Sequence, residues 1–216
     1  MVKWIDISQP LHNNLAHWPG DTAFHYDTPL TKDKTGSVNI GRLTTSTHVG
    51  THVDAPFHYL NDGERIIDLE LERFIGECLV IDLSHVKRIN ASALKEKMIP
   101  ATERLLIKTS LSNQPERFPS DVTPITPDGA AYMASLGIKL IGVDTPSVDP
   151  LSSKDLPGHH ALHKHNIYIL ENVMLDHVPE GKYDFIALPL PLKEADGSLV
   201  RAVIKPFKED IYDSFI

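Results

Sequence analysis

The segment from His48 to His58 restricts the fold most, because it can form neither a regular helix nor a straight strand. It reads His-Val-Gly-Thr-His-Val-Asp-Ala-Pro-Phe-His. The proline and the β-branched residues disfavour a helix. Full extension would separate His48 from His52 by about 13 Å, too far for both to bind one ion. We therefore predict a curved loop that bends at Gly50, the least restricted residue. The concave side of this loop would carry His48, His52 and Asp54.

The same residue types suit a metal centre. Imidazoles supply nitrogen ligands, and a carboxylate can bind one cation or bridge two. Three protein ligands leave a position for water, whose pKa falls from about 15.7 toward 7 on zinc, so that hydroxide forms at neutral pH. His58 lies beyond the proline, and a fourth ligand would close the site, so we predict that it moves protons. The predicted ligands are His48, His52 and Asp54.

A second histidine-rich stretch covers residues 156–165 and precedes an apolar strand that leads to Glu171. If its first part is helical, His159 and His163 share a face, and the spacing nominates that pair as ligands. His160 would then point elsewhere. An acid directly after a buried strand is a usual position for a functional group in mixed α/β proteins, which makes Glu171 a further candidate.

Trp18 lies in a turn, His17-Trp18-Pro19-Gly20-Asp21, where no periodicity places it in a core. The sequence leaves two roles open for this side chain: an aromatic wall for a ligand, or an anchor for its own loop. The proline-containing loop 144–150 follows a predicted strand and is placed to line the same pocket.

Composition excludes several classes of protein. The 216 residues hold 21 Lys and Arg against 29 Asp and Glu, and the net charge of −8 argues against nucleic-acid binding. The single cysteine, Cys78, can form neither an internal disulfide nor a cysteine-based zinc site. Twelve histidines beside one thiol favour a metal with nitrogen and oxygen ligands.

No apolar run is long enough to span a membrane, and an acid near the start interrupts any signal-peptide core, so we expect a soluble cytoplasmic protein.

Short β-rich runs alternate with a few helical patterns. The predicted strands are Trp4–Ser8, Val38–Thr45, Cys78–Leu83, Arg104–Lys108, Leu140–Val143, Ile167–Leu170, Asp184–Leu188 and Arg201–Lys205. The predicted helices are Thr126–Gly137, with a threonine cap and proline in the first turn, Ala91–Met98, and a third from Leu156 or Pro157 to about His165. Since no repeat or linker interrupts the chain, we predict one mixed α/β domain over residues 1–216. It would have a central mixed sheet or barrel-like β core and short flanking helices.

The segment 48–58 resembles the HxGTHxDxPxH signature of the cyclase family of metal-dependent hydrolases, and it is most similar to the bacterial kynurenine formamidases in that family. The similarity extends over nearly the whole chain. Its other motifs are Trp18-Pro19-Gly20-Asp21-Thr22, Pro146-Ser147-Val148-Asp149-Pro150, His159-His160, Leu170-Glu171-Asn172, Leu188-Pro189-Leu190 and Arg201-Ala202-Val203-Ile204.

The resemblance implies the cyclase-family fold, of the swivelling β/β/α kind, and a homo-oligomer, commonly a dimer. It also implies two zinc ions per subunit, which manganese or cobalt can replace. One zinc would be held by His48, His52 and Asp54. Asp54 would bridge to a second zinc, which His159 and Glu171 complete.

The resemblance also selects among the residues that spacing leaves open. The family ligand lies twelve residues before the glutamate, which selects His159 rather than His163 and leaves His160 as the nearest alternative. Trp18 would line the substrate pocket. His58 would be the general acid/base, since imidazole exchanges protons near neutral pH.

The implied activity is hydrolysis of N-formyl-L-kynurenine to L-kynurenine and formate, a step of tryptophan degradation, by a zinc-bound hydroxide with a histidine acid/base. The sequence has no Gly-x-Ser-x-Gly motif, which removes the serine-hydrolase route to this reaction. Two alternatives stay open. One is a related enzyme that opens another cyclic or aryl amide, such as isatin, and the other is a non-catalytic metal-binding protein.

Overall fold

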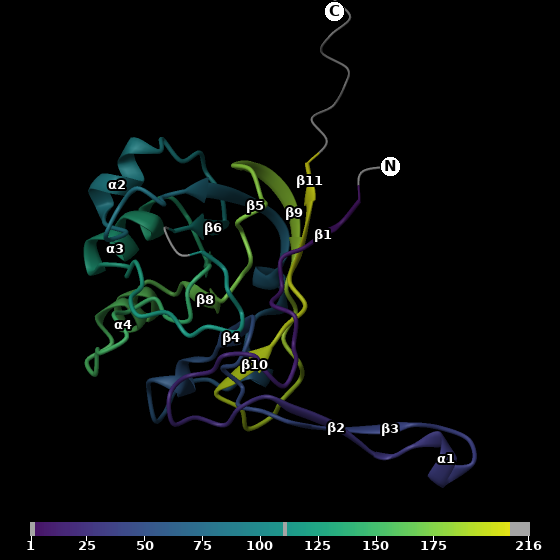
Figure 1. Cartoon of the computed structure of the whole chain (residues 1–216). Coiled ribbons are helices and arrows are strands. Elements are labelled where there is room, and N and C mark those ends of the chain that lie inside the picture. Colours follow the sequence, from purple (N-terminus) through teal and green to yellow (C-terminus); the bar gives the residue numbers. More distant parts are fainter. Residues whose placement is uncertain (1–2, 110–111, 208–216) are drawn as a thin grey trace, which may run out of the picture.

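The computed structural model describes residues 3–109 and 112–207, and within them a nine-stranded mixed sheet forms the centre of the fold. From one edge to the other its strands are β1 (Ile5–Asp6), β11 (Val203–Pro206), β9 (Gly181–Ile186), β5 (Ile75–Asp82), β6 (Arg104–Lys108), β7 (Leu140–Val143), β8 (Tyr168–Glu171), β4 (His52–Asp54) and β10 (Gly197–Leu199). Strands β5 to β8 pair in parallel, and the remaining pairs are antiparallel. The sheet curls into a half-barrel (Figure 1), which confirms the predicted mixed α/β class with a barrel-like core.

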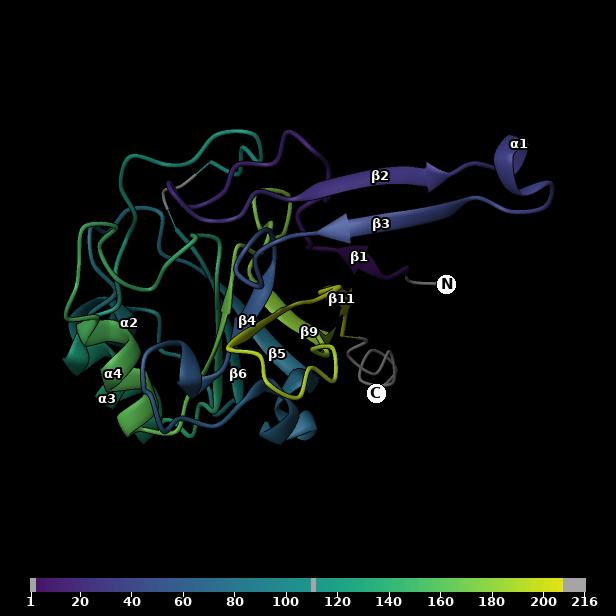
Figure 2. The same cartoon turned by 90° about the horizontal axis from the view of Figure 1, so that it is seen from below.

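Helices α2 (Ala91–Glu96), α3 (Pro127–Ser135) and α4 (Pro157–Lys164) lie together on one side of the sheet (Figures 1 and 2). They confirm the predicted helices, with ends within about two residues. Helix α3 shows why: the Thr126 hydroxyl accepts a hydrogen bond from the Gly129 N–H, proline opens the first turn, and Gly137 follows with a φ of +83°. The short turns η1 (Pro56–His58), η2 (Ile66–Asp68) and η3 (Leu71–Phe74) connect β4 to β5. In the described part of the chain, no helix has the length and apolar character to cross a membrane.

The central strands are buried on both faces. On the side of the helices the core contains Ile81, Leu105, Ile107, Ile141, Val143 and Ile169. On the opposite side it contains Val80, Leu106, Leu140, Leu170, Phe185 and Ile204. Successive residues of a strand therefore fill alternate cores. Strands buried on both faces read as continuous apolar runs, which is why the sequence locates β6 and β7 with their correct ends.

The structure adds three strands that the sequence did not predict: β2 (His25–Leu30), β4 and β10. The last two have three residues each, too few for an alternating pattern to show. Strand β2 pairs with β3 (Ile40–Thr44) in a separate two-stranded sheet, which projects from the body with α1 (Lys32–Thr35) at its tip (Figure 2). We call residues 25–44 the arm. Its exposed large apolar side chains are Tyr26, Leu30, Val38, Ile40 and Leu43.

Candidate metal centre

The candidate site forms where β4 pairs with β8, at the carboxyl end of β8. In this antiparallel pair His52 lies opposite Glu171, and Asp54 lies opposite Ile169. Side chains that are directly opposite, or two apart on one strand, share a face of the sheet. His52, Asp54 and Glu171 therefore point to the same side, and all three are buried. Because Ile169 belongs to the core beneath the helices, this is the helix-covered side.

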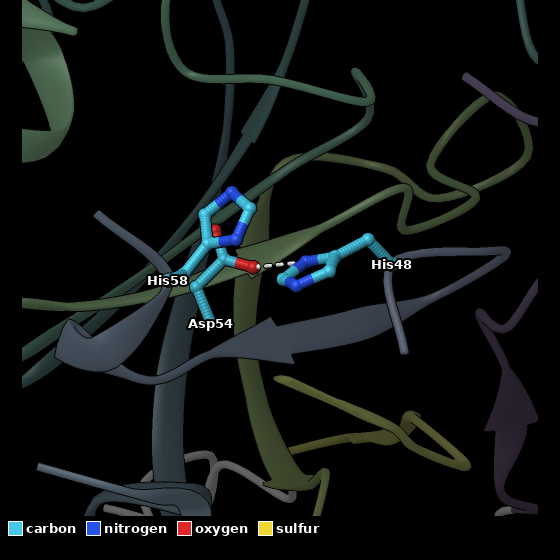
Figure 3. Close-up of side chains that lie close together, drawn as sticks. All are labelled: His48, Asp54 and His58. Atoms are coloured by element: carbon cyan, nitrogen blue, oxygen red, sulfur yellow. Dashed lines mark hydrogen bonds and ion pairs between the residues drawn. The ribbon is translucent and has the colours of Figure 1, made fainter. Parts of the chain in front are cut away.

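The predicted bend at Gly50 is present. Gly50 has a φ of +70°, and the chain turns there before β4 begins at His52. The bend brings Nδ1 of His48 to 2.9 Å from Oδ1 of Asp54 (Figure 3). The rings of His48 and His52 are 5.1 Å apart, centre to centre. Beyond the bend the chain is a regular strand rather than a continued curve, because residues 52–54 pair with both β8 and β10.

His159 reaches the site from the first turn of α4, which Asp149 holds in place. Oδ1 of Asp149 accepts a hydrogen bond of 2.7 Å from the Gly158 N–H. Its Oδ2 accepts bonds from the backbone N–H of His159 at 3.0 Å and from Nδ1 of the same residue at 2.7 Å. Nε2 of His159 then lies 3.4 Å from Oδ2 of Asp54 and 3.8 Å from Oε1 of Glu171. One carboxylate thus caps the helix and aims the imidazole.

The structure does not bring His163 to the site, contrary to the nomination from helical spacing. His163 and His160 are exposed, and their rings lie 5.9 and 5.8 Å from the ring of Tyr59. Only the first turn of α4 lies next to Asp54 and Glu171, so a residue one turn later on the helix is too far along it to contact them. The residue placed beside the carboxylates is His159, which the family spacing selected.

Each of three imidazoles in the cluster is oriented by a hydrogen bond at one ring nitrogen, the one that points away from the centre of the cluster. The bonds are His52 Nδ1 to the Gly50 carbonyl (2.8 Å), His159 Nδ1 to Asp149 (2.7 Å) and His48 Nε2 to Asp196 (3.0 Å). The opposite nitrogens face the carboxylates; Nε2 of His52, for example, is 3.4 Å from Asp54 and 3.5 Å from Glu171. Metal-binding histidines are held in this way, with one nitrogen free for the ion.

The chemistry of this cluster fits a cation. Oδ2 of Asp54 is buried and has no hydrogen-bond partner among the residues that the structure describes. Asp54 also belongs to two groups of three residues, and within each group the ligand atoms lie within 4.8 Å of one another. The first group is His48, Asp54 and His58; the second is His52, Asp54 and Glu171. Imidazoles and carboxylates are ligands that zinc and similar ions accept. An unsatisfied carboxylate oxygen among imidazole nitrogens is therefore a fitting place for metal.

The charges of the cluster are strongly coupled. Burial lowers the pKa of His48, but hydrogen bonds with Asp196 and Asp54 outweigh it and raise the pKa to about 10. Burial likewise lowers the pKa of His159, but the carboxylates of Asp149, Asp54 and Glu171 outweigh it and raise the pKa to about 10. The hydrogen bond with His48 and the neighbouring ring of His58 hold the pKa of Asp196 well below its usual value. A cation that bound these imidazoles would therefore have to displace protons from them.

His58 lies at the rim of the cluster, in the turn η1. Its ring is 3.9 Å from the ring of His48, and its Nδ1 is 3.7 Å from Oδ2 of Asp196. Figure 3 shows it beside His48 and Asp54. The side chain of His58 is 33% exposed, whereas that of His52 is 1% exposed. From the rim an imidazole can exchange protons with a molecule in the adjoining cavity.

A cavity of about 300 Å³ adjoins the cluster, which is a usual size for a small-molecule site. Its wall also includes Trp18 and Phe118, whose rings meet edge to face at 5.3 Å, and residues of the loop 144–150. The Ala16 N–H donates a 2.7 Å hydrogen bond to the Pro115 carbonyl and ties the two loops of this wall together. The side chain of Trp18 therefore lines the cavity and contacts the second loop through Phe118, and its role toward a ligand stays a prediction.

Two carboxylates of the site were missed by the sequence reasoning, Asp149 and Asp196. Asp149 lies in the loop expected to line the pocket, but no local signal connects it with His159. Asp196 precedes a glycine, a pair that signals only a turn. It reaches the site because β10 pairs with β4.

Residues 5–150 match the model of the Cyclase family. The chain is 52% identical over 204 residues to the kynurenine formamidase of Bacillus cereus, a span of 94% of this chain and 98% of that protein. The kynurenine formamidase of Bacillus anthracis is also 52% identical, with the same coverage.

Solved structures share the fold. One is described as a potential metal-dependent hydrolase with cyclase activity and has a TM-score of 0.83 at 25% identity. The superposition covers 96% of this chain and 100% of that protein's chain. A predicted metal-dependent hydrolase from Bacillus stearothermophilus has a TM-score of 0.81 at 26% identity, with the same coverage. An isatin hydrolase bound to thioisatinate has a TM-score of 0.83 at 23% identity and covers 96% of this chain and 93% of its own, a likeness of fold alone.

Proposed function

Because the chain belongs to the Cyclase family, we propose that it is a metal-dependent amidohydrolase that converts N-formyl-L-kynurenine to L-kynurenine and formate. The observation that carries this proposal is the cluster of buried imidazoles and carboxylates beside a cavity of small-molecule size. The kynurenine formamidases of Bacillus, which share half of their residues with this chain, support the choice of substrate.

We propose that two zinc ions occupy the cluster, one held by His48, His52 and Asp54, and the other by Asp54, His159 and Glu171. The membership of Asp54 in both groups of convergent ligand atoms supports a bridging role. By distance alone, the ligand atom of His58 lies with those of His48 and Asp54, and that of His52 lies with those of Asp54 and Glu171. The metal content of His52 and His58 variants therefore has to decide which of these two histidines is a ligand, and of which ion. Nitrogen and oxygen ligands also accept manganese or cobalt.

The proposed reaction adds water to the formyl carbon, breaks the C–N bond, and delivers a proton to the departing aniline nitrogen. When bound, the ions would polarise the formyl carbonyl and lower the pKa of a coordinated water. His58 would take a proton from the attacking water and return it to the nitrogen, because its side chain lies on the cavity wall and histidine is the most frequent general acid and base in enzymes. The products are formate and L-kynurenine.

Trp18 suits the aryl ring of the substrate. It lines the same cavity as His48, His52 and His159 and meets Phe118 edge to face. Aromatic rings favour edge and offset contacts with one another. A ring held against this wall would direct its formyl group toward the imidazoles and carboxylates.

Zinc-loaded protein is expected to release kynurenine from N-formyl-L-kynurenine, and a chelator is expected to abolish this activity until zinc is restored. The absorbance of kynurenine gives the rate, and the metal is counted in the same sample. Isatin, assayed in parallel, tests the related cyclic-amide activity. Faster hydrolysis of isatin would reassign the substrate, and no hydrolysis of either compound by the metal-loaded protein would indicate a binding protein.

We further propose that the protein is a homodimer in which the arm packs against a second copy. A two-stranded hairpin alone is marginally stable in water, and exposed apolar patches mark contact sites. Tyr26 lies opposite Leu43 in the arm, and the two side chains are 51% and 54% exposed. A second copy would cover this apolar pair.

Leu43→Glu is therefore expected to convert the dimer to a monomer, because a buried unpaired charge opposes association. Light scattering behind size-exclusion chromatography measures the mass. Ser37→Glu is the control, since it adds the same charge at an exposed position between α1 and β3. A monomeric wild-type protein, or a Leu43→Glu variant that stays dimeric, would contradict this arrangement.

The other partner that we propose is the small-molecule substrate. The net charge of −8 argues against nucleic acid. Cys78 is buried and free, as is common for proteins of the reducing cytoplasm, where we propose that this enzyme acts.

A further inference from the structure

Asp196 lies directly before β10 and faces two histidines of the site. Its Oδ2 is 3.0 Å from Nε2 of His48 and 3.7 Å from Nδ1 of His58. Its Oδ1 accepts a 2.9 Å hydrogen bond from the hydroxyl of Thr47. We propose that Asp196 is a positioning residue, which holds the His58 ring with Nδ1 toward the carboxylate and Nε2 toward the cavity. This inference rests on the proposed role of His58 as the proton carrier.

The backbone fixes Asp196 in this place. Its carbonyl accepts a 2.8 Å hydrogen bond from the Ala55 N–H, and the next residue, Gly197, pairs with Asp54 between β10 and β4. Gly197 also leaves room for the ring of His48, since a Cβ at this position would lie 2.7 Å from Cε1 of that ring. Strand pairing therefore sets the direction from which the carboxylate approaches both imidazoles.

A carboxylate in this position determines which nitrogen of His58 carries the proton. A neutral imidazole favours its proton on the nitrogen that faces a carboxylate, and the nitrogen of His58 that faces Asp196, at 3.7 Å, is Nδ1. Its lone pair is then on Nε2 and can accept a proton from water. The negative charge of Asp196 also stabilises the imidazolium that forms, as a carboxylate does for the histidine of a catalytic triad.

The competing explanation is that Asp196 acts only on His48, which it approaches more closely than His58. The two explanations differ in the effect of removing the carboxylate. Loss of a partner of His48 would lower the metal content, because partners of ligating histidines support metal affinity. Loss of the partner of His58 would lower turnover at full metal content.

The test compares Asp196→Asn in the wild-type and His58→Ala backgrounds, with each protein loaded with zinc and assayed on N-formyl-L-kynurenine. In the wild-type background we expect kcat, expressed per zinc-loaded site, to fall about 10–100-fold with KM unchanged. In the His58→Ala background we expect no further fall, because a residue that acts through His58 has nothing left to position. Glu194→Gln, which neutralises an exposed carboxylate two residues away, is expected to leave kcat unchanged. An equal fall in both backgrounds, or a loss of zinc that accounts for the lost activity, would overturn the proposal.

A measurement without substrate separates this proposal from the proposed function. In zinc-loaded protein that carries 15N-histidine, NMR is expected to show the Nδ1–H tautomer of His58, and Asp196→Asn is expected to shift it toward Nε2–H. If the shift is seen but wild-type protein does not hydrolyse the substrate, the positioning is supported and the proposed function fails. An active wild-type protein whose His58 tautomer ignores the substitution would refute the positioning role.

Discussion

We expect His52→Ala to remove bound metal, and His58→Ala to keep the metal but lower kcat by about 10²–10⁴-fold, the usual contribution of a general acid or base. The reason lies in their surroundings. Nε2 of His52 is buried between Asp54 and Glu171, at 3.4 and 3.5 Å. The ring of His58 is one-third exposed at the cavity, and its Nδ1 faces Asp196.

Metal content and steady-state kinetics, measured on the same preparations, decide this comparison. His163→Ala is the matched control, because it makes the same change at an exposed position on α4. His58 also has a ligand atom within 4.8 Å of those of His48 and Asp54. Loss of metal from His58→Ala would therefore make it a ligand, and unchanged turnover would remove it from the mechanism.

Asp54→Asn is expected to release both ions and abolish turnover, a larger effect than the loss of a ligand that serves one ion. Burial disfavours the charge of Asp54, but the neighbouring imidazoles of His159, His48 and His52 outweigh burial and hold its pKa well below the usual value. An amide has nearly the same shape, yet it has no negative charge and only one oxygen. It can therefore not bridge two cations.

Two measurements check this result. The metal count should fall from two per chain to none, and zinc should no longer raise the melting temperature. For wild-type protein, zinc at 100 times its Kd would stabilise the fold by about 2.7 kcal/mol. Asp62→Asn, at an exposed carboxylate, should behave as wild type. If Asp54→Asn kept one ion, the bridging role would be wrong.

The features that the sequence predicted well are those set by nearby residues. Strands β6 and β7 were located with their correct ends because burial on both faces leaves unbroken apolar runs. The bend at Gly50 followed from the short distance that His48 and His52 have to span. These two residues and Asp54 lie within seven positions, so their convergence is a property of one segment.

The features that could not be predicted depend on the pairing of distant segments. No local pattern specifies that β10 lies beside β4, yet this pairing brings Asp196 to His58. The helical period correctly places His163 one turn after His159 on α4. It does not tell how much of that helix meets the carboxylates, and the structure brings only His159 there.

The position of β4 between β8 and β10 also orders events during synthesis. Asp54 leaves the ribosome 117 residues before Glu171, the end of its neighbouring strand β8. At about 5–20 residues per second, this interval lasts roughly 6–23 s, and β10 emerges later still. Until then a cation meets only the ligands of the first segment. Loading of the proposed metal centre would therefore be a late step, completed only after translation has delivered the strands on both sides of β4.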